Sequence, residues 1–192
     1  MRDLPPPPAA PPAEPGARLS LRALLRAGPA ARAIGRADVR LYRLMRTAAR
    51  PPALGPVERF SALGEHAVGW LVLGAAGMAV DRRRRRRWRR ALVTVGGTYA
   101  LNTAIKGVFR RKRPALEDLP ALIATPTALS FPSAHASSSF AAARAYSGLL
   151  PAAPLYATAT AMALSRVYLG VHYPTDIAAG AVLGTLTGSA AR

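Results

Sequence analysis

Charge and apolarity are separated along this chain, and that separation constrains the fold more than any other feature. The chain is 51% hydrophobic, yet it carries a formal net charge of +18. Most arginines fall in residues 1–59 and 82–90, whereas residues 91–105 and 145–191 hold almost none. Apolar spans between basic loops are typical of multi-pass membrane proteins. We therefore expect an all-α integral membrane helical bundle.

Five apolar stretches follow residue 59, at 60–80, 91–109, 135–150, 152–164 and 177–191. Several are shorter than the ~20 residues that cross a bilayer alone, but snorkelling side chains and local bilayer thinning tolerate short spans. The sequence therefore predicts about five to six transmembrane helices. Gly180, Gly184 and Gly188 form a ridge of small residues in the last stretch, which predicts close packing against another helix.

The segment before these stretches has a different composition. Residues 1–17 are proline-rich and lack core-forming side chains, which predicts a disordered tail. Residues 18–57 have the pattern of one or two basic amphipathic helices, broken near Gly28-Pro29 and lying on the membrane surface. A solvated tail that binds nothing is the alternative. The predicted domains are thus the tail, the interfacial helices and a transmembrane domain over 58–192.

A strongly basic chain raises the question of its partners. The aromatic content is only 6%, and no stacking side chains alternate with the basic residues, so nucleic acid is not the predicted partner. The basic run 82–90 lies between two apolar stretches. That position favours a juxtamembrane loop that contacts anionic lipid headgroups. Oligomeric state does not follow from the sequence.

Three short blocks hold nearly every ionisable group that a phosphate-transfer site needs. They are Lys106-x6-Arg113-Pro114, Pro132-Ser133-Ala134-His135, and Ser165-Arg166-x5-His172-x3-Asp176. Each block falls at the end of an apolar stretch, and an antiparallel up-and-down arrangement brings those ends to one membrane face. Charged groups embedded in apolar sequence are expensive unless they face one another. We therefore expect the blocks to form one site.

Five residues in these blocks suit the binding of one phosphoryl group. Lys106, Arg113 and Arg166 supply three cations for its three non-bridging oxygens, and arginine adds bidentate geometry. A helix start at Ser133 would place its hydroxyl and the amide of Ala134 against an anion. These five are the predicted phosphate ligands.

Two of the three histidines complete a catalytic set. Asp176 would bond one nitrogen of His172, fix its tautomer and leave the other nitrogen as nucleophile. His135 would protonate the departing alkoxide as general acid. The predicted chemistry is double displacement through a phosphohistidine, completed by water. Since the cations supply the charge stabilisation, we predict no metal and no cofactor; the alternative, a metal held by both histidines and Asp176, matches no compact ligand spacing.

The blocks resemble the signature of the type 2 phosphatidic acid phosphatase superfamily, K-x6-RP, PSGH and SR-x5-H-x3-D. All three are present in order over roughly residues 60–191. Ala134 stands where the superfamily usually has Gly, and its amide stays available if the backbone is not at positive φ. The resemblance implies a haloperoxidase-like helical core and a metal-independent phosphoric monoester hydrolase. It implies the same roles for His172, Asp176, His135 and the phosphate ligands.

A narrower resemblance concerns the substrate. Gly64-Glu65-His66 before Gly69-Trp70, the run 130–136, and Gly170-Val171-His172-Tyr173-Pro174 are similar to an actinobacterial branch, the decaprenylphosphoryl-5-phosphoribose phosphatases of cell-wall arabinan precursor synthesis. This resemblance implies a lipid-phosphate phosphatase acting on a polyprenyl-phosphate sugar phosphate. Polyprenyl diphosphate, phosphatidic acid and phosphatidylglycerol phosphate remain alternative substrates. A phosphotransferase, or a lipid-binding scaffold with a vestigial pocket, remains an alternative function.

The membrane face of the site depends on the basic segments. If the run 82–90 is cytoplasmic, the second span exits and the site lies on the outer face of the plasma membrane. The basic N-terminal region should also be cytoplasmic, although only one clear span separates the two. Either residues 36–57 hide a short or re-entrant helix, or residues 60–80 do not cross normally. We predict the outward-facing site.

Several polar residues near the blocks have structural interpretations. His66 is interpreted as an interface anchor in preference to a headgroup contact. Asn102 either orients Lys106 or bonds to a neighbouring helix. Arg144 either snorkels or pairs with another helix, and residues 110–112 are interpreted as solvated or lipid-facing, with one of them a possible lipid contact.

Overall fold

The computed structural model describes residues 28–47 and 53–191, and every regular element within these ranges is helical. The elements are α2 (Pro29–Thr47), α3 (Leu54–Ala62), the 3-10 turn η2 (Glu65–Ala67), α4 (Val68–Val80), the 3-10 turn η3 (Arg82–Arg84), α5 (Arg85–Phe109), α6 (Ala134–Tyr146), α7 (Ala152–Tyr168) and α8 (Pro174–Ser189). The all-α prediction is confirmed. The predicted tail over 1–17 lies outside the described residues.

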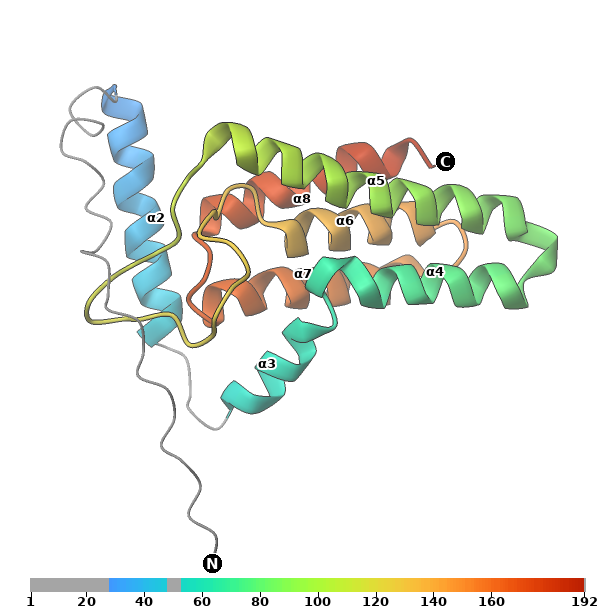
Figure 1. The fold of residues 1–192 in the computed structure, drawn as a ribbon, viewed down its shortest axis with the longest axis horizontal. Coiled ribbons are helices and arrows are strands. Elements are labelled where there is room, and N and C mark those ends of the chain that lie inside the picture. The colour runs from blue at the N-terminus through green and yellow to red at the C-terminus, as the bar shows by residue number, and fades with distance from the viewer. Residues whose placement is uncertain (1–27, 48–52, 192) are drawn as a thin grey trace, which may run out of the picture.

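Helices α4 to α8 form a bundle with their axes along one common direction, and α2 runs across one end of it (Figure 1). The five predicted apolar stretches correspond to α3 with α4, and then to α5, α6, α7 and α8 in turn. Helix α6 lies at the centre, where it packs against α5, α7 and α8. Its side chains are small enough, with buried alanines and serines along its length, for three neighbours to approach it.

The glycine ridge of α8 makes the closest helix contact in the bundle. A Cβ on Gly184 would lie 2.1 Å from the carbonyl oxygen of Ser137, and one on Gly180 would lie 2.7 Å from that of Ser133. Gly188 meets the carbonyl of Ala141 in the same way. The predicted ridge-to-helix packing is therefore confirmed, with α6 as the partner.

The predicted span 60–80 is broken in the structure. The backbone turns left-handed at His66 (φ 50°) and Ala67 (φ 60°), between α3 and α4. Within residues 28–47 and 53–191, each helix taken alone is too short or too polar to cross a membrane. The pair Leu54–Ala62 and Glu65–Val80, bent by 49°, meets the length and composition required. The count of five to six spans stays a prediction.

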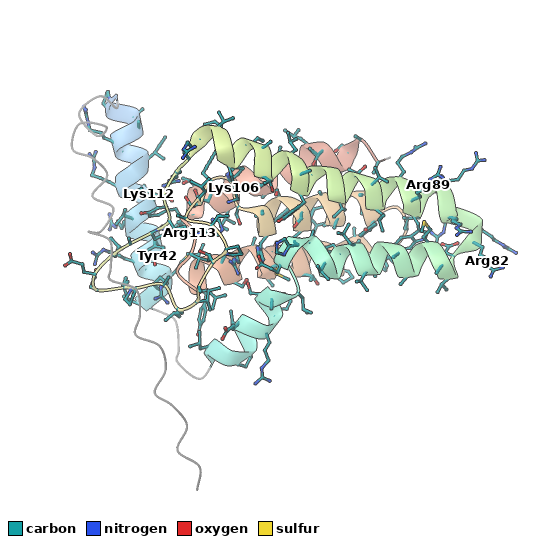
Figure 2. All side chains as sticks on the ribbon, viewed as in Figure 1. Tyr42, Arg82, Arg89, Lys106, Lys112 and Arg113 are labelled. Carbon is teal, nitrogen blue, oxygen red and sulfur yellow. The ribbon has the colours of Figure 1, made fainter. Side chains whose placement is uncertain are left out.

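The basic run and the three blocks lie at opposite ends of the bundle. Arg82 lies at the turn between α4 and α5 and Arg89 lies near the start of α5, whereas Lys106 and Arg113 lie at the far end, beside α2 (Figure 2). The Asp81 side chain caps this turn by accepting from the amide of Arg84 at 3.1 Å and from the indole of Trp88 at 3.2 Å. The turn therefore holds the arginine run away from the candidate site.

Helix α2 is attached to the end of the bundle by its buried face. Tyr42 donates to the carbonyl of Gly170 at 3.3 Å, and Arg46 donates to the carbonyl of Tyr168 at 2.9 Å. Ile34, Leu41 and Leu44 of α2 are exposed, as apolar residues of an interfacial helix would be. These bonds join α2 to residues beyond position 58. The predicted domain boundary between residues 57 and 58 stays a prediction.

Gly184→Ala should destabilise the protein by about 1–3 kcal/mol, because its methyl group would overlap the α6 backbone. Thermal unfolding of the detergent-solubilised protein measures this. Gly97→Ala in α5 is the matched control, since a Cβ there meets nothing within 4 Å, and alanine favours the helix. Equal melting temperatures for the two variants would contradict the packing argument.

Candidate active site

The predicted site residues come from six segments that meet at the α2 end of the bundle, and Arg113 belongs to the loop after α5. Lys106 lies in the last turn of α5, Ser133 caps the start of α6, and Arg166 lies in the last turn of α7. His172 lies in the loop before α8 and Asp176 in the first turn of α8. The structure brings together the residues that the sequence placed at separate helix ends.

Main-chain contacts show how closely these segments approach. The amide of Ser133 donates to the carbonyl of Asp176 at 3.0 Å, so the starts of α6 and α8 are joined. Lys106 donates through Nζ to the carbonyls of Leu129 and Ser130, at 3.2 and 3.1 Å. The lysine therefore ties α5 to the segment that leads into α6.

The tautomer of His172 follows from its contact with Arg113. Nη1 of Arg113 lies 3.1 Å from Nε2 of His172, and a guanidinium N–H can only donate. Nε2 is therefore the acceptor and Nδ1 carries the proton. Nδ1 lies 3.4 Å from Oδ2 of Asp176, although among the described residues no contact of Nδ1 has full hydrogen-bond geometry. The two side chains of the predicted histidine–carboxylate pair therefore lie close together, with Nδ1 facing the carboxylate.

The surroundings of His172 favour a neutral ring. Its side chain is buried, and burial holds the pKa of His172 well below its ordinary value. The positive charges of Arg113, Lys106 and Arg166 lower that pKa further. A neutral imidazole with its proton on Nδ1 has a free electron pair on Nε2 for attack on phosphorus.

The block around Ser133 has the predicted form of a helix start. The Ser133 hydroxyl accepts from the amide of Ala136 at 3.5 Å, and Ala134 is the first residue of α6. Ala134 is not among the described residues with positive φ, so alanine fits there without backbone strain. The amide of Ala134 lies at the positive end of the α6 dipole, where an anion is favoured.

His135 and Arg166 meet at Ser61, a residue that no sequence pattern singled out. Nε2 of His135 lies 3.1 Å from the carbonyl of Ser61, so that nitrogen carries the proton. Arg166 donates through Nη1 to the Ser61 hydroxyl at 2.7 Å. Oε2 of Glu65 lies 3.8 Å from the same histidine nitrogen. The end of α3 therefore positions two of the predicted site residues.

Arg111 is not solvated or lipid-facing, as interpreted from the sequence, but lies in an ion-pair network. It pairs with Asp176 at 2.9 Å and with Asp38 of α2 at 2.6 Å. The sequence held no signal for this contact beyond the two charges themselves, since Asp38 and Arg111 are 73 positions apart.

The remaining polar residues have structural partners. Asn102 donates to the carbonyl of Pro132 at 3.3 Å, so it bonds to the segment before α6. Arg144 donates to the hydroxyl of Ser189 on α8 at 3.0 Å, which is pairing with another helix. The exposed His66 packs its ring 5.8 Å from that of Tyr99. In the part of the chain that the structure describes, no three carboxylate or histidine side chains gather as a metal site.

Comparison with known proteins identifies the family. The model of the PAP2 superfamily matches residues 87–192. This chain belongs to the PAP2 superfamily. Relatives named decaprenylphosphoryl-5-phosphoribose phosphatase are 42% identical over 141 residues in Mycobacterium tuberculosis, covering 73% of this chain and 79% of the relative. The Mycolicibacterium smegmatis relative of that name is 43% identical over 135 residues, covering 69% and 74%.

Solved PAP2-like structures share the fold. LpxE of Aquifex aeolicus superimposes with a TM-score of 0.69 at 25% identity, covering 80% of this chain and 93% of that one. The transmembrane PAP2-type phosphatidylglycerolphosphate phosphatase of Bacillus subtilis gives a TM-score of 0.68 at 24% identity, covering 90% and 89%. The predicted superfamily and its helical core are confirmed, whereas the roles of individual site residues stay predictions.

Ser61→Ala should lower the stability of the protein by about 1.5–3 kcal/mol, because the buried Arg166 loses its hydroxyl partner. Thermal unfolding in detergent tests this. Ser138→Ala is the control: its hydroxyl is also buried, but it bonds only to carbonyls within its own helix. Equal losses of stability in the two variants would contradict a stabilising role for the Ser61–Arg166 hydrogen bond.

Proposed function

We propose that this protein is a membrane lipid-phosphate phosphatase that hydrolyses a phosphomonoester through a phosphohistidine at His172. The observation that carries the proposal is the state of His172. Its Nε2 lies 3.1 Å from Nη1 of Arg113, which can only donate, and this contact assigns the proton to Nδ1, 3.4 Å from Oδ2 of Asp176. Arg113 is a predicted phosphate ligand, so a phosphoryl group bound to it would lie close to Nε2 of His172, the nucleophile.

In the first step, the phosphoryl oxygens would be held by Lys106, Arg113, Arg166 and the start of α6. Arg113 would transfer its N–H bond from Nε2 of His172 to a phosphoryl oxygen, which frees the electron pair. Nε2 then forms a bond to phosphorus while the bond from phosphorus to the alcohol oxygen breaks. Asp176 stabilises the positive charge that develops on the ring of His172.

His135, as an imidazolium that the charge of the bound phosphoryl group favours, would give its Nε2 proton to the departing alkoxide, which leaves as the alcohol, and the ring becomes neutral. That proton is held by the carbonyl of Ser61 in the structure, so the ring must exchange this acceptor for the leaving oxygen. In the second step, His135 takes a proton from water as the water oxygen attacks phosphorus. The bond from phosphorus to Nε2 breaks, and inorganic phosphate is released.

The proposed substrate is decaprenylphosphoryl-5-phosphoribose, because relatives at 42% and 43% identity are named as phosphatases of that compound. An apolar groove of about 320 Å³ supports a lipid substrate. It lies between α2, α3 and α7, where Phe60 and Leu164 line it, and it reaches Ser165, next to Arg166. Polyprenyl diphosphate, phosphatidic acid and phosphatidylglycerol phosphate are the substrates against which the proposal is tested.

The proposed location is the plasma membrane, with the site on its outer face and the run 82–90 against anionic lipids of the inner face. Support comes from the positions of the basic run and the site at opposite ends of the bundle (Figure 2). Arginines of that run are exposed, and each cation near an anionic surface contributes about 1 kcal/mol of binding.

The first test is release of inorganic phosphate by the full-length protein in detergent, with EDTA present, from decaprenylphosphoryl-5-phosphoribose and the three alternative lipids. The wild type should release phosphate, and His172→Ala should lose at least about 10³-fold in kcat because the nucleophile is gone. His66→Asn is the matched control, since His66 is exposed and asparagine accepts its left-handed backbone. Activity that requires a divalent metal, or that survives in His172→Ala, would overturn the mechanism.

The same assay tests the general acid. His135→Ala should slow release from the lipid alcohol much more than release from nitrophenyl phosphate, because a good leaving group needs little protonation. Equal losses on both substrates would remove His135 from that role. Transfer of phosphate to an added alcohol, measured in the same reactions, would favour the phosphotransferase alternative.

Cysteine labelling tests the membrane face, because the chain has no cysteine of its own. Glu117→Cys places a thiol in the exposed loop at the site end, and Arg86→Cys places one at the other end. A membrane-impermeant maleimide should label the Glu117→Cys variant in intact cells, and the Arg86→Cys variant only after permeabilisation. The reverse pattern would place the site on the cytoplasmic face.

A further inference from the structure

Asp38 of α2 is a buried carboxylate whose contacts lead to the candidate catalytic pair. Only 3% of the residue is exposed. Its Oδ1 accepts from the amide of Thr175 at 2.9 Å. Its Oδ2 accepts from the Thr175 hydroxyl and from Nη2 of Arg111, both at 2.6 Å. A carboxylate that is buried this deeply is tolerated because charged and polar donors surround it.

Arg111 continues the network from Asp38 to the first turn of α8. Its Nη1 donates to Oδ1 of Asp176 at 2.9 Å and to the Thr175 hydroxyl at 2.7 Å. Its guanidinium lies over the Tyr173 ring, 4.3 Å from the centroid. With both terminal nitrogens engaged, Arg111 is a link between two carboxylates and is not a phosphate ligand.

The link determines which way the Asp176 carboxylate points. Arg111 occupies Oδ1, and Oδ2 accepts from the amide of Tyr173 at 2.9 Å. Oδ2 is also the oxygen that lies 3.4 Å from Nδ1 of His172. Because Arg111 is itself held by Asp38, a residue of α2 determines how Asp176 faces the histidine.

We propose that Asp38 and Arg111 are positioning residues for the His172–Asp176 pair, which makes α2 part of the catalytic unit. The catalytic meaning of this inference rests on the proposed function. Without Asp38, the permanent charge of Arg111 has Asp176 as its one remaining carboxylate partner within residues 28–47 and 53–191. The guanidinium would then draw the carboxylate toward itself and away from Nδ1 of His172.

The competing explanation is that the network only attaches α2 to the bundle. The structure contains a second ion pair that does this without touching the site. Arg43 of α2 pairs with Asp118 in the loop before α6, and both side chains are about half exposed. Asp118→Asn is therefore a matched control for Asp38→Asn, because each removes one carboxylate charge from an ion pair between α2 and the same loop.

The experiment compares kcat, KM and melting temperature for the full-length wild type and both variants, with the lipid phosphate that the wild type hydrolyses. In Asp38→Asn the negative charge is lost, and the NH₂ group of the amide can face the N–H groups of Arg111, with which it forms no hydrogen bond. We expect kcat to fall by about 10- to 100-fold, with KM within about twofold. Asp118→Asn should retain the wild-type kcat. Wild-type kcat in folded Asp38→Asn, or equal losses in both variants, would overturn the inference.

A second readout does not depend on turnover. The chain has three histidines, so their side-chain ¹⁵N resonances are few, and His172→Ala assigns those of His172. The wild type should show one tautomer for His172, protonated on Nδ1, and Asp38→Asn should show a mixture. Unchanged His172 resonances would overturn the inference. Absence of phosphate release by the wild type would instead overturn the proposed function, and this spectrum would still test the positioning.

Thr175 keeps the inference testable if Asp38→Asn does not fold. Thr175→Val removes the hydroxyl that Asp38 and Arg111 share, with little change of shape, and Thr175→Ser keeps that hydroxyl. Thr175→Val should lower kcat at constant KM and mix the His172 tautomers. Thr175→Ser should retain the wild-type values. Wild-type behaviour in Thr175→Val, or equal loss in Thr175→Ser, would contradict the network.

Discussion

The carboxylate and carbonyl of Asp176 join α8 to the loop after α5, to the loop before α8 and to the start of α6. Oδ1 binds Arg111, and through it Asp38 of α2. Oδ2 accepts from the Tyr173 amide and faces His172. The main-chain carbonyl accepts from Ser133 at the start of α6. With Asp176 fully buried, loss of its negative charge would leave Arg111 with Asp38 as its carboxylate partner and would remove a compensating charge from beside the buried Lys106 and His172, and uncompensated buried charges are costly.

Close packing of α6 and α8 makes this arrangement possible. The glycine ridge allows the backbones of the two helices to approach closely along their length. Their N-terminal ends therefore lie side by side, at Ser133 and Asp176. Both helices direct the positive ends of their dipoles toward the same volume. Lys106, Arg113 and Arg166 add full charges from three other segments. An anion is therefore stabilised by charges that the fold fixes in advance, which is the form of stabilisation that phosphoryl transfer needs most.

Helix α2 and α3 illustrate what sequence reasoning missed. The sequence predicts one or two basic amphipathic helices over residues 18–57, broken near Gly28-Pro29 and lying on the membrane surface. That pattern describes the exposed faces, whereas the role inferred for Asp38 depends on a partner 73 positions away. Ser61 meets Arg166 across 105 positions. The left-handed backbone at His66 and Ala67 separates α3 from α4, and α3 carries the Ser61 that contacts His135 and Arg166.

The sequence by itself determined the family, the all-α class, the order of the helices and the set of candidate phosphate-binding and catalytic residues. These follow from local patterns: apolar runs of helical length, a small-residue ridge, and blocks whose internal spacings place chemically distinct side chains at helix ends. The tertiary structure alone decided that Nε2 of His172 faces Arg113, that Ser61 holds His135 and Arg166, and that Asp38 reaches Asp176 through Arg111. Those contacts join segments far apart in the chain, and their geometry exists only after the helices have packed.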